Sequence, residues 1–142
     1  NSSPTDFFGI TNNLYKVLYN QPVKLKEPAH KRMEYYIEKI GVTKALVEYK
    51  KMQTDTAHYY IDWISMNFLA QQLLNLKRLE EAAAIAENNV NEFPDKDLIN
   101  LTMGNIYLAQ QRKQEAIRYF KKALEITPGY EEARNRLKEL EK

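Results

Sequence analysis

The sequence predicts an all-α protein in which antiparallel helix-turn-helix units stack side by side and a capping helix closes the C-terminal end. Amphipathic patterns with helical spacing follow one another along most of the 142 residues. Glycine and proline are scarce, at four and five residues, so helices can run without interruption. Pro94 and Pro128 each follow an amphipathic stretch. Their separation of about 34 residues is a period that indicates repeated helical hairpins.

Residues at equal distances before these two prolines share their size and polarity. At four of the six distances compared, the two stretches carry the same type of residue. These are a large apolar residue, a small residue, a second large residue and an alanine. We expect the small residues where two antiparallel helices approach closely, because a larger side chain there would push the helices apart. Each proline ends the second helix of its unit, since its ring disfavours helix in the preceding residue. The compared residues are Met103, Gly104, Tyr107, Ala116, Phe120 and Ala123, against Leu69, Ala70, Leu73, Ala82, Ala86 and Asn89.

This pattern resembles the tetratricopeptide repeat, a helix-turn-helix unit of about 34 residues. Residues 97–130 suit the family pattern well. Residues 63–96 depart from it at Ala86, where a large aromatic residue is usual, and at Asn89, where a small residue is usual. The resemblance implies a short right-handed α-solenoid that mediates contacts with other proteins.

The pattern divides the chain into five expected segments. The first is an N-terminal short helix, marked by Leu14, Val17 and Leu18, with an extended connector, and the second is a degenerate hairpin of the same kind, joined at Gly41. Two repeats and a solubilising capping helix follow. The expected segments are 1–27, 28–62, 63–96, 97–130 and 131–142. Helices are predicted at 28–40, 43–53, 58–75, 79–92, 96–110, 113–125 and 130–141, with no strand.

A second resemblance concerns the order of these pieces. It is similar to the C-terminal extension of bacterial serine hydrolases of the beta-lactamase and penicillin-binding type, in which tetratricopeptide-like helices follow the catalytic domain. The likeness covers roughly residues 12–130 and implies that this chain is the C-terminal part of such an enzyme, periplasmic or secreted. It is carried by Val17-LYNQ-Pro22, Ile40-GVTKALVEYKK-Met52, Met66-NFLAQQLL-Asn75 and Leu79-EEAAAIAENNVNEF-Pro94.

The S-x-x-K and Lys-Thr-Gly motifs of that family do not occur in these residues. No serine has a lysine three residues later, and there is no Lys-Thr-Gly sequence. We therefore expect a non-catalytic module, and the lack of an initiator methionine and of a signal pattern suggests a fragment of a longer protein.

Composition argues against several other functions. The net charge of +2 and its even distribution disfavour nucleic-acid binding, although Arg112, Lys113, Arg118, Lys121 and Lys122 make one helix locally basic. Zero cysteines and two isolated histidines, His30 and His58, predict neither a metal site nor a cofactor. No apolar run is long enough to insert into a membrane.

The candidate site is the concave face that the first helices of the two repeats would line. Most of its positions are apolar or carry amides and none is lysine or arginine, so it suits an apolar peptide segment whose backbone the amides could bond. The occupant could be another protein bound by a free-standing adaptor, the chain's own N-terminal segment, or the parent catalytic domain. The residues are Ile64, Asn67, Phe68, Gln71, Leu98, Leu101, Thr102 and Asn105.

Overall fold

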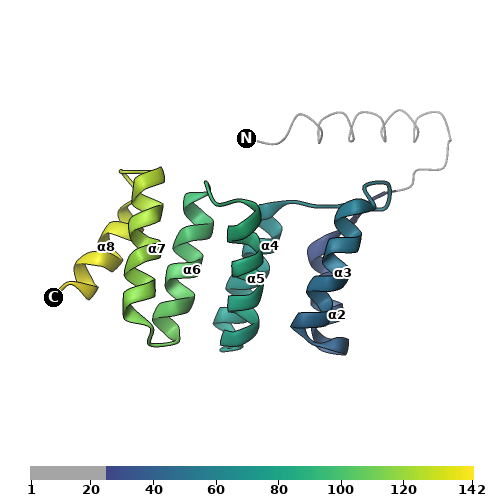
Figure 1. Cartoon of the computed structure of the whole chain (residues 1–142), viewed down its shortest axis with the longest axis horizontal. Coiled ribbons are helices and arrows are strands. Elements are labelled where there is room, and N and C mark those ends of the chain that lie inside the picture. Colours follow the sequence, from purple (N-terminus) through teal and green to yellow (C-terminus); the bar gives the residue numbers. More distant parts are fainter. Residues whose placement is uncertain (1–24) are drawn as a thin grey trace.

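A computed structural model describes residues 25–142, and these residues form an all-α helical repeat, as predicted (Figure 1). The predicted short helix before residue 25 lies outside the described residues. The helices are α2 (Ala29–Ile40), α3 (Val42–Thr54), α4 (Trp63–Asn75), α5 (Leu79–Glu92), α6 (Asp97–Ala109), α7 (Lys113–Ile126) and α8 (Glu131–Leu140).

The helices pack as three antiparallel hairpins followed by one further helix. The pairs are α2 with α3, α4 with α5, and α6 with α7, and α8 packs on α7. Between hairpins, α4 contacts both α2 and α6, and α5 contacts both α3 and α6. Figure 1 shows the helices standing side by side in one row, from α2 to α8. One continuous apolar core therefore runs through the stack.

Small side chains allow close approach within the second repeat. Gly104 on α6 faces the ring of Phe120 on α7, and a Cβ added at residue 104 would overlap that ring. In the preceding hairpin the equivalent residues are Ala70 and Ala86, and both are buried. The α4–α5 hairpin therefore has two alanines where the α6–α7 hairpin has a glycine and a large ring. This explains the departure of Ala86 from the family pattern.

Asn89 departs from the pattern for a different reason. Its side-chain amide donates a hydrogen bond of 3.0 Å to the backbone carbonyl of Trp63, so the end of α5 is tied to the start of α4. In the second repeat the hydroxyl of Thr127 makes the corresponding connection, donating to Asp97 Oδ2 at 2.6 Å. Both hairpins are thus closed at the end opposite their turn.

The turns inside these two hairpins are the same. Lys77 and Gln111, which occupy equivalent positions in the two repeats, both adopt a positive φ, at 61° and 62°. The following residue donates its backbone N–H five residues back in each case, from Arg78 to Leu73 and from Arg112 to Tyr107, at 2.9 Å. This is a Schellman turn, which satisfies carbonyls at the helix end.

The first hairpin has a tighter turn. Gly41 alone separates α2 from α3 and has a φ of 80°, which a residue with a side chain rarely adopts. Ala45 and Tyr49 of α3, which have the same spacing as Ala116 and Phe120, are fully buried.

The prediction that residues 58–142 contain no strand is wrong, and so is the predicted start of a helix at residue 58. The two short strands β1 (Glu27–Pro28) and β2 (Tyr59–Tyr60) pair in parallel, and the N–H of Glu27 donates to the carbonyl of His58 at 2.8 Å. Helix α4 starts later because Asp62 caps it, accepting from the N–H of Ser65 at 2.7 Å. The helical periodicity applies from Trp63 onward.

Replacing Gly104 with leucine should destabilise the fold by about 1–3 kcal/mol or more, because the new side chain overlaps the buried Phe120 ring. Chemical denaturation monitored by circular dichroism measures this loss. Gln114→Leu, at an exposed position of α7, is the matched control and should change stability by no more than about 0.5 kcal/mol. Equal losses in the two variants would contradict the assigned helix contact.

Candidate protein-binding face

The predicted face residues lie on α4 and α6, but their accessibility differs widely. Ile64 and Phe68 are 57% and 56% exposed, so both can touch a partner. Asn67, Leu101 and Thr102 are buried in the core between helices. The remaining three, Gln71, Leu98 and Asn105, are partly exposed.

Two of the predicted polar residues contact each other across the repeats. The side-chain amide of Gln71 on α4 donates to the hydroxyl of Thr102 on α6 at 3.0 Å. This bond holds the two helices together and uses one of the donors that we expected to be free for a peptide. The side-chain oxygen of Asn105 is buried and accepts no hydrogen bond within the described residues.

A hollow of about 490 Å³ lies beside these residues, between α4, α6 and α8. It includes Gln71 and Asn105 together with apolar groups of Leu74 and Leu108. Lys77, Glu132 and Arg136 also line it, so cations from outside the first helices lie at the same hollow. The expectation of a face without lysine or arginine considered only the first helices of the two repeats, whereas Lys77 lies in a turn and Arg136 lies on α8.

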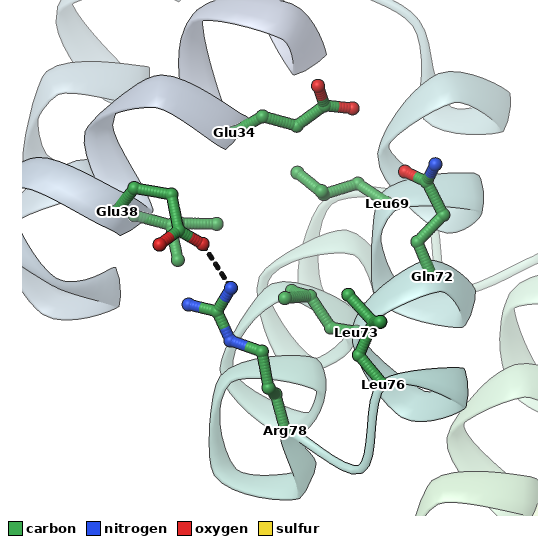
Figure 2. Close-up of a pocket in the computed structure, with 8 residues that line it drawn as sticks. Glu34, Glu38, Leu69, Gln72, Leu73, Leu76 and Arg78 are labelled. Carbon is green, nitrogen blue, oxygen red and sulfur yellow. Dashed lines mark hydrogen bonds and ion pairs between the residues drawn. The ribbon is translucent and has the colours of Figure 1, made fainter.

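A second hollow, of about 250 Å³, lies between α2 and α4 (Figure 2). Ile37, Leu69, Leu73 and Leu76 provide its apolar lining. The other lining residues are Glu34, Glu38, Gln72 and Arg78, and Figure 2 shows Arg78 reaching toward Glu38 from the opposite side. The sequence did not indicate this site, because α2 belongs to the hairpin that departs most from the repeat.

Arg78 connects three elements at this second hollow. It follows the turn after α4, and it forms ion pairs with Glu38 of α2 and Glu81 of α5. Its Nη2 atom donates to Glu81 Oε1 at 2.8 Å. Arg112 repeats the pairing with Glu115 at the equivalent position of the next repeat, and that periodicity is the signal from which the Arg78–Glu81 pair could have been predicted.

The ion pairs shift the acidity of their members. Hydrogen bonds that Arg78 donates hold the pKa of Glu81 below its ordinary value, and the same bonds to Glu81 and Glu38 raise the pKa of Arg78. Arg78 therefore stays charged, and the pairing depends on pH through the carboxylates.

The basic residues in and just before α7 are partly committed to aromatic contacts. Arg112 lies 4.3 Å from the ring centre of Tyr107, and Arg118 and Lys122 lie 5.2 and 5.1 Å from that of Tyr119. The hydroxyl of Tyr107 donates to Glu87 on α5 at 3.2 Å. The Tyr107 hydroxyl therefore joins α6 to α5, and the ring of Tyr107, 5.5 Å from that of Tyr119, joins α6 to α7.

Other types of site have little support in residues 25–142. Within that range no three His, Cys, Asp or Glu side chains are grouped as metal ligands. The described helices also include none that is long and apolar enough to cross a bilayer. His58 is engaged with Asp55, at 2.7 Å from Nδ1 to Oδ1.

Arg78→Gln should lower the free energy of unfolding at neutral pH by up to about 1 kcal/mol, since partly exposed ion pairs contribute little. Because the pKa of Glu81 is lowered on folding, this contribution is complete above the ordinary glutamate pKa and is lost as pH falls through the folded-state value. Thermal unfolding across acidic and neutral pH measures the difference. Lys50→Gln, on the exposed side of α3, should show no such pH dependence, and a loss from Arg78→Gln that is equal at all pH values would contradict the pairing.

Comparison with known proteins identifies one family. A search of curated proteins found no match. The family model of the tetratricopeptide repeat matches residues 98–130, which comprise all but the first residue of α6, all of α7 and the turn between them. This chain therefore has a tetratricopeptide-type hairpin at α6–α7, within an all-α helical repeat.

Proposed function

We propose that this chain is a non-catalytic protein-interaction module whose first helices bind an apolar segment of a protein. The observation that carries the proposal is the exposure of Ile64 and Phe68, one helical turn apart on α4, beside the two hollows. Large apolar side chains that remain exposed and adjacent in this way are typical of contact surfaces. Tetratricopeptide repeats generally act in protein–protein contacts, which supports the same interpretation.

The chemistry of the hollow between α4, α6 and α8 suggests how such a segment would be oriented. Leu74 and Leu108 offer apolar contact, and the side-chain amide of Gln71 and that of Asn105 line the same hollow. Lys77 and Arg136 place positive charge at the same hollow, with Glu132 as a counter-charge. An apolar peptide with a carbonyl or carboxylate near these cations would satisfy both parts.

The proposed units of the module are the five segments expected from the sequence. We propose the degenerate hairpin at 28–62, repeats at 63–96 and 97–130 and the capping helix at 131–142, preceded by the N-terminal segment 1–27. The turns at Lys77 and Gln111 and the ties from Asn89 and Thr127 support the two repeats. Five of the proposed contact residues are accessible, namely Ile64, Phe68, Gln71, Leu98 and Asn105. The other three, Leu101, Thr102 and Asn67, are buried in the core.

Peptides selected from a randomised display library against the full chain should be apolar, and they should lose at least about tenfold in affinity for an Ile64→Asp/Phe68→Asp double variant. Both side chains are exposed, so the variant should remain folded by circular dichroism. Leu101→Asp is unsuitable because that side chain is buried. Val47→Asp, at a residue of α3 that is 54% exposed, is the matched control and should bind normally. Selected peptides that bind the double variant as well as the original chain would contradict the assignment of this face.

We further propose that this chain belongs to a longer enzyme. The sequence resemblance supports a bacterial serine hydrolase of the beta-lactamase type, with this chain as its C-terminal part and a periplasmic or secreted location. The gene sequence upstream of Asn1 tests this directly. An S-x-x-K motif about 200–350 residues earlier, a typical domain length, is expected. A start codon close to Asn1 would instead leave the alternative, a free-standing adaptor that binds an apolar peptide.

The chain alone should not hydrolyse a beta-lactam or an ester above the buffer rate, because a serine nucleophile, its base and oxyanion donors are not assembled in the described residues. Ser65 and Asn67 have S-x-N spacing, but Asn67 is buried and no S-x-x-K motif accompanies them. A chromogenic assay with the purified chain measures the rate. Saturable turnover by the purified chain would contradict the assignment of a non-catalytic module, and its loss in Ser65→Ala would place the activity at that serine.

A further inference from the structure

The exposed apolar side chains of α4 gather on one side of that helix. Ile64, Phe68 and, just after the helix, Leu76 are 57%, 56% and 67% exposed. Because residues three or four apart share a helix face, Ile64 and Phe68 form one stripe that leads toward Leu76. A stripe of this kind at the surface is normally covered.

The side of α4 that faces α2 is hollowed. Leu76 lines the hollow of about 250 Å³ between the two helices, together with Leu69, Leu73 and Ile37. These three are nearly fully buried, so they form an apolar floor. Glu34 and Glu38 of α2 provide the opposite, acidic wall (Figure 2). We call this hollow, with Ile64 and Phe68, the α2–α4 groove.

The chain enters the described structure at one end of this groove. Strand β1 pairs with β2, which fixes Glu27 against His58 and Tyr59, a few residues before α4 begins at Trp63. Leu25, just before β1, is 74% exposed. The part of the chain that precedes Leu25 is therefore attached at the Ile64 end of the groove.

The sequence of that preceding segment fits the groove in pattern and length. Apolar residues recur at helical spacing at Phe7, Ile10, Leu14, Val17 and Leu18. As a helix, residues 7–19 would be about 20 Å long, the same as the 13 residues of α4. Residues 20–24 could span up to about 17 Å if extended, enough to turn the chain back along α4.

We propose that residues 7–19 of the same chain cover the α2–α4 groove, with Leu14 and its apolar neighbours on Phe68 and Leu76. The segment then acts as an internal competitor on the face that the proposed function assigns to a protein partner. A partner that binds Phe68 must first displace this segment. The apparent affinity for the partner is then the intrinsic affinity multiplied by the fraction of molecules whose groove is open.

Hydrogen exchange of the full chain, read by mass spectrometry, tests the contact. Amides of residues 10–18 should exchange at least about tenfold more slowly than those of the same segment as a free peptide. Phe68→Asp and Leu14→Asp should each remove this protection. The matched controls Val47→Asp and Asn13→Asp should keep it, and circular dichroism should show the helices of α2 to α8 intact in all four variants.

Three results would overturn the proposal. The first is an exchange rate in residues 10–18 equal to that of the free peptide. The second is protection that increases with protein concentration, which would assign the groove to a second copy of the chain. The third is protection that survives both Phe68→Asp and Leu14→Asp.

The proposed function and this inference rest on the same face but fail separately. Protection of residues 10–18 without any peptide binding would leave the internal contact standing and remove the external partner. Peptide binding to a chain whose N-terminal segment is unprotected would do the reverse.

Discussion

The close approach of antiparallel helices within each hairpin is the constraint on which the structure depends. At Gly104 the helices come so near that a single added carbon would overlap the ring of Phe120, and that ring is fully buried. The preceding hairpin solves the same packing problem with Ala70 and Ala86. Because the space between paired helices is filled in these two ways, both hairpins can share one stacking geometry along a continuous core.

That geometry also explains why a contact surface remains on the first helices. The Schellman turns at Lys77 and Gln111 return the chain along the helix it has just left, and the ties from Asn89 and Thr127 close the other end. The first helix of each hairpin then packs one side against the second helix of the same hairpin and other sides against the adjacent hairpins. On α4 the remaining surface carries Ile64 and Phe68 instead of charged residues, so the sequence leaves apolar area where folding alone does not require it.

The sequence predicted the helices well because their evidence is periodic. The large and small residues at Met103, Gly104 and Tyr107 recur in type 34 positions earlier, as do the two prolines, and most helix boundaries follow from this period. It did not predict the β1–β2 pair, because strands of two residues are too short to show an alternating pattern of apolar and polar side chains. It also did not predict that Asp62 caps α4. It also could not separate exposed Phe68 from buried Leu101, since burial on a first helix depends on the neighbouring hairpin. Lys77 and Arg136 reach the face from a turn and from α8, outside the repeat positions that were compared.

The most direct test of the central constraint is a double-mutant cycle on Gly104→Ala and Phe120→Ala, with stability measured by denaturant unfolding. In the original chain, Gly104→Ala should destabilise, because the new carbon meets the Phe120 ring. In the Phe120→Ala background the overlap is gone, and the same change should stabilise by up to about 1 kcal/mol, because alanine favours helix over glycine. This reversal of sign would establish that Gly104 is required by the helix contact. An identical effect of Gly104→Ala in both backgrounds would contradict it.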